Sequence, residues 1–403
     1  MNLYQKLLLG THACYGLANS MAGLFLNLYL WKISQDLTVN ASFNLATFFF
    51  CLFAFILGAL LAKKKDRIFS FQIGVGLTAL FYLLIVLLQE NVAAFPMFIG
   101  VLNGMAMGFY WLGYLTLLYD LVDAPSRSAF MGKQNAIFGF VSTLGPAFAG
   151  LVISQFQFTG YNLVFGFSFL LFFIGLLLSF RLPKEESAIK EPFLLKLLWK
   201  YNLQKPILKP MWFGWFIFGM CEGLLIFFPT IILFMAVNNE FLVGISSILF
   251  GIVAVLSNLW HSAYNHQKRE PATVLQIWVL YLIACILMIF YMNAWTVILF
   301  LIVNEMSKAL LGVSYFSFMF RTIGDLPKTG LRIESMVMRE IMLNGGRILS
   351  VLIFIFLYQV SEELTYYFFL LTIGLQGILY FIISSEKKNL LSRKKKIKLQ
   401  GGF

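Results

Sequence analysis

The sequence predicts an all-helical protein that crosses a membrane many times, and three observations lead to that prediction. Apolar stretches of about twenty residues follow one another along the chain, which is the length that a helix needs to cross the hydrocarbon layer of a membrane. Nearly all lysines and arginines lie in every second gap between these stretches. The composition, with 60% hydrophobic and 12% charged residues among 403 and a mean hydropathy of +0.84, is typical of membrane proteins.

Each apolar stretch is predicted to be a helix, because hydrocarbon offers no hydrogen-bond partner to a bare backbone and a helix satisfies its own backbone groups. In chain order, the twelve predicted spans are residues 7–31, 41–62, 69–88, 93–118, 136–156, 162–181, 209–236, 243–262, 272–291, 295–319, 341–360 and 365–385.

The distribution of basic residues predicts the orientation of the chain in the membrane. One set of gaps is rich in them and includes Lys63–Arg67, Arg181–Lys209 and Lys387–Lys398. The opposite gaps hold a single basic residue, Lys32. Because basic loops stay in the cytoplasm, we expect a multi-pass protein of the cell (inner or plasma) membrane with both termini in the cytoplasm.

The net charge of +12 does not indicate a nucleic-acid partner, because the basic residues flank the spans in short loops. Such residues follow the insertion rule and contact anionic lipid headgroups, so membrane lipids are the expected partners. The cysteines all lie within spans and show no metal-binding spacing: Cys14, Cys51, Cys221 and Cys285. Neither a metal nor a cofactor is predicted.

The longest polar interruption, residues 182–208, predicts a division of the chain into two parts. It contains Glu191–Tyr201, a predicted amphipathic helix lying on the cytoplasmic face. An N-terminal six-helix half (1–181) precedes this cytoplasmic linker. A C-terminal six-helix half (209–385) and a basic cytoplasmic tail (386–403) follow it.

The two halves show signs of an internal repeat. A shift of 205 residues aligns Tyr110 with Tyr315 and Arg127 with Arg332, each at an equivalent point of an equivalent span or loop. Parallel six-helix halves joined by a long cytoplasmic linker are the layout of a large class of secondary transporters.

The fifth span carries a pattern of glycine and proline, made of Gly132, Gly145, Pro146 and Gly150. An acidic-basic pair, Asp66 and Arg67, follows the second span. With the two-half layout, these features resemble the major facilitator superfamily of secondary transporters over nearly the whole chain. The span-five pattern is similar to that of the superfamily's proton-coupled exporters, although Val141 and Ala149 stand where that pattern has glycine.

The resemblance implies two pseudo-symmetric six-helix halves that work by alternating access, and we expect a monomer whose partners are a small-molecule substrate and protons. It also implies that helices one, four, seven and ten line a central cavity. A catalytic set of side chains is not evident, because only three histidines occur and no carboxylates are paired with them. We therefore do not expect an enzyme.

Ionisable residues inside the spans are the first functional candidates, because burying a charge in a bilayer costs on the order of several kcal/mol. Glu222 lies near the middle of span seven, and we interpret it as the proton-coupling residue. The alternative is a permanently protonated carboxyl bonded to its helix. Glu305 and Lys308 share one face of span ten. They either contact a polar part of the substrate or neutralise each other in a structural role.

Further candidates for the substrate cavity lie on spans one and four. Asn19 is on span one, and Tyr110, Trp111 and Tyr114 are on span four. The three aromatic residues could form a wall for an amphiphilic or ring-bearing substrate, or they could pack helices together.

Charged residues near the cytoplasmic ends of the spans predict a gate. Opposite charges at equivalent places in the two halves could pair when the inside is closed, or they could only orient the loops. The candidates are Asp66, Arg67, Asp120, Arg127, Asp325, Arg332, Arg339, Glu340 and Arg347.

The sequence therefore predicts proton-coupled export of a small hydrophobic or amphiphilic solute. The span-five pattern favours export with proton exchange, and the cavity candidates are mostly apolar and aromatic. Two alternatives stay open, an uptake permease for a small organic solute and a non-transporting membrane receptor on the same scaffold.

Overall fold

The computed structural model confirms that the chain is almost entirely helical. The structure describes residues 2–64, 67–122, 124–183, 198, 200, 208–264, 270–324 and 332–385. The helices of the first part are α1 (Leu3–Ser34), α2 (Leu37–Lys64), α3 (Arg67–Leu88), η1 (Gln89–Ala94), α4 (Pro96–Leu121) and α5 (Ala124–Ser179). Those of the second part are α7 (Leu208–Leu225), α8 (Phe228–Val237), α9 (Glu240–Tyr264), α10 (Glu270–Phe290), α11 (Ala294–Gly324), α12 (Arg332–Val360) and α13 (Glu362–Leu375).

The helices have the length and composition that membrane crossing requires. Among the described residues, ten helical stretches are long and apolar enough to span a membrane. One of the ten, Phe130–Ser179, covers two predicted spans, and α1 is not among them. The membrane fold class is confirmed, while the count of twelve spans stays a prediction.

Two breaks in the helices follow from local backbone geometry. Within α5, Gln157 has φ 52° and ψ −129°, and an added Cβ on Gly160 would lie 2.6 Å from the Cα of Ile153. Residues this close cannot belong to one straight helix, so α5 turns back at Gln157. The predicted seventh span is also divided, because α7 ends at Leu225 and α8 begins with Pro229 in its first turn. Proline suits that position because the first turn of a helix needs no backbone N–H donor.

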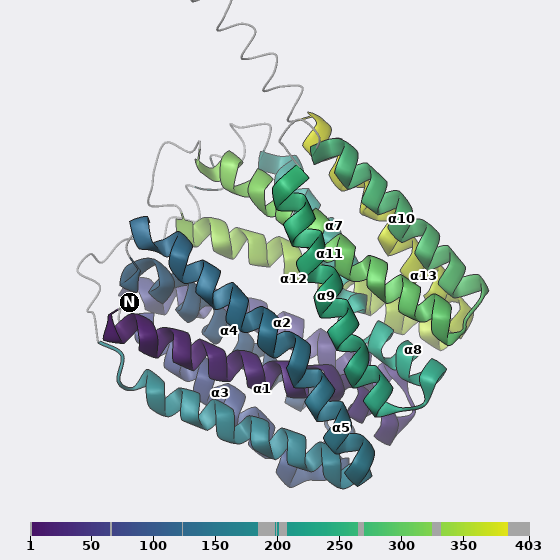
Figure 1. Ribbon diagram of the computed structural model, residues 1–403, viewed down its shortest axis with the longest axis horizontal. Coiled ribbons are helices and arrows are strands. Elements are labelled where there is room, and N and C mark those ends of the chain that lie inside the picture. Colours follow the sequence, from purple (N-terminus) through teal and green to yellow (C-terminus); the bar gives the residue numbers. More distant parts are fainter. Residues whose placement is uncertain are drawn as a thin grey trace, which may run out of the picture.

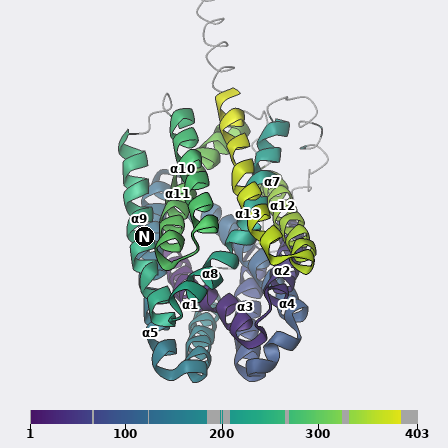
Figure 2. The same ribbon diagram turned by 90° about the vertical axis from the view of Figure 1, so that its right-hand side faces the viewer.

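The helices form two groups that lie side by side (Figure 1), with α1–α5 at the lower left and α7–α13 at the upper right. Within the first group α1 packs on α5 and α2 on α4, and within the second α7 packs on α12 and α10 on α11. The groups meet where α5 contacts α9 and α2 contacts α12. The turned view (Figure 2) shows α8 at the end of the second group that lies near α1, and these two helices are also in contact. This arrangement supports the predicted two halves, whose boundaries remain a prediction.

The outside of the bundle is apolar. Large hydrophobic side chains are exposed along several helices, among them Phe140, Phe156, Leu256, Phe356 and Phe381. Exposed apolar surface on this scale is unfavourable in water and is what a lipid-facing surface requires. The inside of each group is closely packed around buried aromatic residues such as Tyr110 and Tyr315.

Candidate functional site

A cavity of about 560 Å³ lies where the two helix groups meet. Its walls come from both groups, because α1, α2, α4 and α5 line it on one side and α7, α8, α9 and α11 on the other. The polar lining residues of the first group include Asn19, Ser20, Asn27, Asn44, Thr47 and Asn103. Those of the second group include Glu222, Thr230, Asn304, Glu305 and Lys308. The cavity thus has an amide-rich wall opposite a charged wall.

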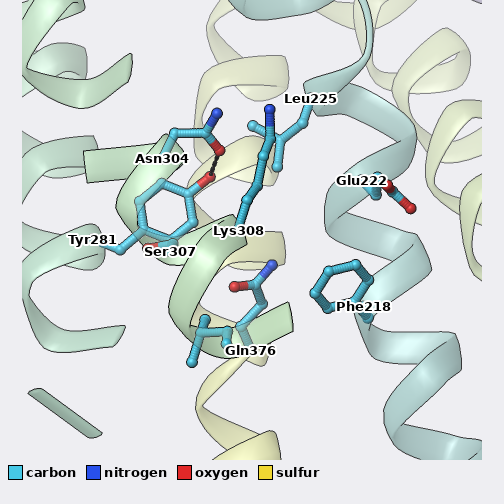
Figure 3. A pocket seen from close by; sticks show the side chains of 9 residues that line it. Phe218, Glu222, Leu225, Tyr281, Asn304, Ser307, Lys308 and Gln376 are labelled. Carbon is cyan, nitrogen blue, oxygen red and sulfur yellow. Dashed lines mark hydrogen bonds between the residues drawn. The ribbon is translucent and has the colours of Figure 1, made fainter. Parts of the chain in front are cut away.

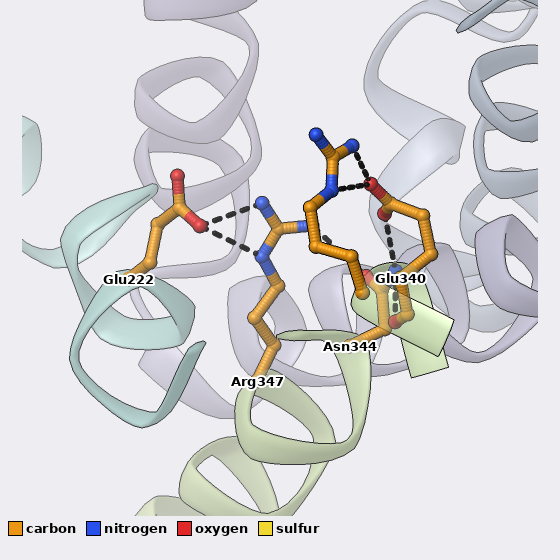
Figure 4. A network of polar contacts seen from close by, with 5 residues as sticks. Glu222, Glu340, Asn344 and Arg347 are labelled. Atoms are coloured by element: carbon orange, nitrogen blue, oxygen red, sulfur yellow. Dashed lines mark hydrogen bonds and ion pairs between the residues drawn. The ribbon is translucent and has the colours of Figure 1, made fainter. Parts of the chain in front are cut away.

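Glu222 on α7 and Arg347 on α12 form an ion pair beside this cavity (Figure 4). Oε2 of Glu222 accepts hydrogen bonds from Nη2 of Arg347 at 2.7 Å and from Nε at 3.1 Å. The Arg347 side chain is 12% exposed and that of Glu222 is 31% exposed. The guanidinium also lies 5.3 Å from the ring centroid of Phe48 on α2, in the other helix group. The pair therefore joins the charged wall of the cavity to the interface between the groups.

The pair continues into a chain of polar contacts along α12 (Figure 4). Nη1 of Arg347 donates to Oδ1 of Asn344 at 2.9 Å, and Nδ2 of Asn344 donates to Oε2 of Glu340 at 3.0 Å. Oε1 of Glu340 in turn accepts from Nε of Arg339 at 3.1 Å. Asn344 and Glu340 are buried, so the four side chains of this α12 network satisfy one another away from water.

Glu305 and Lys308 form a second pair on the same wall. Nζ of Lys308 lies 2.7 Å from Oε1 of Glu305, and the Lys308 side chain is 48% exposed. A small hollow lies between Lys308 on α11 and Glu222 on α7 (Figure 3). Tyr281 and Asn304 also line it, and the Tyr281 hydroxyl donates a hydrogen bond to Oδ1 of Asn304 at 2.7 Å. A further hollow of about 360 Å³ reaches Glu305 and Lys308 from between α9 and α11. Lys308 therefore borders the central cavity and both hollows, and Glu305 borders the cavity and the larger hollow.

Two more ion pairs join the helix groups near the ends of the bundle. Lys32 on α1 pairs with Glu240 on α9, and its ammonium lies 5.3 Å from the ring centroid of Phe234. At the other end, Lys63 on α2 pairs with Glu334 on α12, with Nζ to Oε1 at 2.5 Å. The Lys63–Glu334 pair is almost fully buried. Each pair holds a helix of one group to a helix of the other.

The span-five pattern lies partly at this interface. An added Cβ on Gly150 would lie 2.7 Å from the carbonyl oxygen of Glu240 and 3.0 Å from the Cα of Gly244 on α9. Gly145 faces Ser20 of α1, whose hydroxyl donates to the carbonyl of Val141 at 2.8 Å. Gly132 has no neighbouring atom within 4 Å of an added Cβ among the described residues. Gly145 and Gly150 therefore allow close helix contact, and Gly132 does not take part in it.

In this conformation the span-four aromatics pack between helices, which is one of the two roles that the sequence leaves open for them. Tyr110 and Tyr114 are buried within the first helix group, and Trp111 is not among the cavity-lining residues that the structure describes. Tyr110 hydrogen-bonds Nδ1 of His12 at 2.5 Å, and the His12 ring stacks on Tyr114 with centroids 3.7 Å apart. The three aromatics thus pack α4 onto α1 around His12.

The gate candidates separate into three sets. Arg347 pairs with Glu222 near the middle of α12, and its role in a gate stays a prediction. Arg339 and Glu340 pair with each other next to it, and Arg67 begins α3. Asp66 and Asp325 lie outside the residues that the structure describes. The structure also does not describe the side chains of Asp120, Arg127 and Arg332.

Of the cavity amides in the first helix group, the sequence predicts Asn19 but misses Asn27, Asn44 and Asn103. Each of these three lies in an apolar span, and asparagine carries no charge to mark it. The available signal was spacing, because Asn40 and Asn44 are four residues apart and therefore share a helix face. Arg347 was noticed as a charge inside a span, but nothing local to it identifies Glu222, 125 residues away, as its partner.

Comparisons with known proteins agree with this architecture. A family model described as Major Facilitator Superfamily matches residues 8–327. The chain is 30% identical over 351 residues to the uncharacterized protein YqgE of Bacillus subtilis (strain 168), which is 87% of this chain and 81% of that protein. It is 32% identical over 160 residues to an uncharacterized protein in the sodM 3' region of Geobacillus stearothermophilus, covering 40% of this chain and 75% of that protein.

Two solved structures share the fold. The nucleoside transporter NupG matches with a TM-score of 0.69 and 17% identity, covering 95% of this chain and 99% of that one. A bacterial homologue of the iron transporter ferroportin in an inward-facing state matches with a TM-score of 0.68 and 14% identity, covering 96% and 100%. At these identities the similarity concerns the fold alone.

Proposed function

This chain belongs to the Major Facilitator Superfamily and is a multi-pass membrane transporter, and we propose that it exports a small amphiphilic solute in exchange for protons. The proposed route is alternating access, in which the two helix groups rock around the central cavity so that it opens to one side at a time.

The Glu222–Arg347 pair is the observation that carries the proposal. Glu222 faces the cavity and is 31% exposed, so a proton entering the cavity can reach it. Protonation would remove the charge that holds Arg347 and leave the guanidinium to its remaining contact with Asn344. Because Arg347 also contacts Phe48 of the other helix group, a change at Glu222 is passed directly to the interface that has to move.

The fifth-span glycines support the proposed direction. In the resemblance described above, a glycine and proline pattern at this place belongs to proton-coupled exporters. Gly150 allows α5 to approach α9 closely at the contact between the groups, which is where such a pattern could control opening. Uptake of a solute remains the alternative direction.

The cavity lining favours an amphiphilic cargo over a purely hydrophobic one. Apolar side chains such as Phe43, Phe48 and Phe250 share the walls with amides and with Glu305 and Lys308. A purely hydrophobic solute would displace water from these polar groups without replacing the water's hydrogen bonds, which costs about 1–3 kcal/mol for each buried group left unsatisfied. A solute with both a polar head and an apolar part satisfies both kinds of wall.

The experiment is a flux assay with the purified full-length protein in proteoliposomes that contain a pH-sensitive dye. A panel of short-chain amphiphiles with the same tail and amide, amine, carboxylate or hydroxyl heads is added under an imposed pH gradient. We expect at least one member to drive proton movement, and Glu222→Gln to abolish that movement.

Glu363→Gln is the matched control, because Glu363 is an exposed carboxylate at the start of α13 and is not part of the cavity. Full proton-coupled flux in Glu222→Gln would remove Glu222 from the coupling role. Absence of flux for the whole panel, with pH or voltage gradients of either sign, would favour a receptor over a transporter.

A further inference from the structure

An asparagine cluster lies on the amide-rich wall of the cavity, formed by Asn27 of α1 with Asn40 and Asn44 of α2. Asn27 and Asn44 line the cavity, and all three are buried. Buried amides inside a membrane protein are costly unless every polar atom finds a partner. Their hydrogen bonds therefore indicate which atoms are satisfied within the protein and which are not.

Backbone carbonyls fix the orientation of two of the amides. Nδ2 of Asn40 donates to the carbonyl of Asn27 at 2.6 Å, and Nδ2 of Asn44 donates to the carbonyl of Asn40 at 2.8 Å. A carbonyl oxygen only accepts, so the atoms facing it must be the nitrogens. Both nitrogens also approach the same atom of Asn27, at 3.3 and 2.8 Å. That atom must accept and is therefore Oδ1.

The remaining atoms of the two cavity-lining amides are left open. Nδ2 of Asn27 and Oδ1 of Asn44 have no hydrogen-bond partner among the residues that the structure describes. In the hydrogen bond between these two side chains, Asn44 uses its amide nitrogen and Asn27 uses its amide oxygen. The open atoms are the other polar atom of each amide group. The two side chains consequently offer one open donor and one open acceptor.

The contact between α1 and α2 does not use the open atoms of Asn27 and Asn44. Three hydrogen bonds of the cluster already tie the two helices together. Oδ1 of Asn40 is also fully buried and without a partner in the described part of the chain. Asn27 and Asn44, in contrast, line the cavity, so a ligand in the cavity can reach these two residues and bond their open atoms.

Charge selects the kind of ligand. The charged residues among the described cavity lining, Glu222, Glu305 and Lys308, all belong to the second helix group, so the wall around Asn27 and Asn44 is neutral. Phe43 and Phe48 lie on the same wall, where they can pack on an apolar tail. A neutral head with its own adjacent acceptor and donor, as in a primary carboxamide or a lactam, complements the open donor and acceptor.

We propose that Asn27 and Asn44 form a head-group subsite for a neutral amide of the transported solute. This inference rests on the proposed transport function, because it assigns a substrate class to the same cavity. One additional well-placed hydrogen bond should favour an amide head over an amine head by about two- to tenfold.

The test uses Asn27→Asp in the full-length protein. This change keeps an oxygen that accepts from Asn44 and Asn40 and replaces the open donor with a second acceptor. Binding is measured by thermal shift with hexanamide, hexylamine, hexanoate and hexanol. We expect the wild type to bind hexanamide more tightly than hexylamine and Asn27→Asp to show the opposite preference, each by about two- to tenfold.

Asn40→Ala is the matched control, because it removes an interhelical hydrogen bond of the cluster without changing a cavity-lining residue. It should lower the melting temperature and leave the head-group preference unchanged. No preference for hexanamide in the wild type, or the same preference in Asn27→Asp, would overturn the subsite. If either result is found but another amphiphile of the flux panel still drives proton movement, the subsite fails and the transport function stands. The failure of the subsite can therefore be distinguished from the failure of the transport function.

Discussion

At the scale of single residues, the central feature is a pair of opposite charges that the sequence presents 125 positions apart. Arg347 alone in the bundle would be an uncompensated cation, and Glu222 alone would be an uncompensated anion. Together they satisfy each other through two hydrogen bonds at 2.7 and 3.1 Å. A buried pair of this kind adds little to stability compared with apolar packing, but loss of one partner is strongly destabilising. The pair is therefore better explained by function than by folding.

The stability of the pair can be measured with three variants. Arg347→Gln and Glu222→Gln should each lower the free energy of unfolding by about 1–3 kcal/mol, because each leaves one charge without its partner. The double variant should lose less than the sum of the two. Thermal unfolding of the purified protein in detergent measures all three, and strict additivity would contradict direct coupling between the side chains.

Tyr110 can distinguish the two roles that the sequence leaves open for the span-four aromatics. Tyr110→Phe removes the hydrogen bond to His12, 2.5 Å long, and should lower the free energy of unfolding by about 0.5–1.5 kcal/mol. Because Tyr110 is fully buried away from the cavity, the concentration of solute giving half-maximal flux should stay unchanged. A large shift in that concentration would return Tyr110 to the substrate site.

At the scale of helices, the contact of α5 with α9 depends on glycines that face each other across it. An added Cβ on Gly150 meets the backbone of α9, and an added Cβ on Gly244 lies 3.0 Å from the Cα of Gly150. Side chains larger than hydrogen would push the helices apart. The fifth-span pattern thus acts through its missing side chains, by allowing backbones to touch.

Gly150→Leu should therefore prevent the helices from closing at this end. Overpacking costs typically about 1–3 kcal/mol, which is enough to shift a two-state equilibrium about tenfold or more. We expect loss of flux, with higher labelling of a cysteine placed beside Lys32. Gly139→Leu on the same helix is the control, since an added Cβ there meets no atom within 4 Å in the described residues, and equal effects of both variants would refute the proposal.

At the scale of the whole molecule, ion pairs at both ends of the bundle hold the two helix groups together. Lys32–Glu240 lies at the end predicted to face outward, and Lys63–Glu334 lies at the end predicted to face the cytoplasm. The cavity lies between them. Alternating access requires that contacts at one end break while those at the other end hold, so each pair is a candidate latch for one end.

The outer latch can be tested by exchanging its charges. Lys32→Glu alone places two carboxylates together and should open that end and reduce flux. The double variant Lys32→Glu with Glu240→Lys should recover flux in part, although Lys32 also lies over the rings of Phe158, Tyr161 and Phe234. Distances between spin labels on α1 and α9 report the opening. A double variant as impaired as the single one would show that the pair itself is not the latch.

The sequence by itself determined the membrane class and most helix positions, because these depend on local hydropathy and on charges in neighbouring loops. It also singled out Glu222, Glu305, Lys308 and Arg347, since a charge inside an apolar span is visible without a structure. The superfamily followed from the pattern of spans and was confirmed by the family match.

Only the tertiary structure decided which of these residues face one another. It paired Arg347 with Glu222 across 125 residues, placed Tyr110 against His12 and not in the cavity, and brought Asn27 beside Asn44 on the cavity wall. The physical reason is that a helix presents its side chains in every direction. The face that turns towards a partner is fixed by packing between helices that are distant in the chain, and no local pattern encodes that packing.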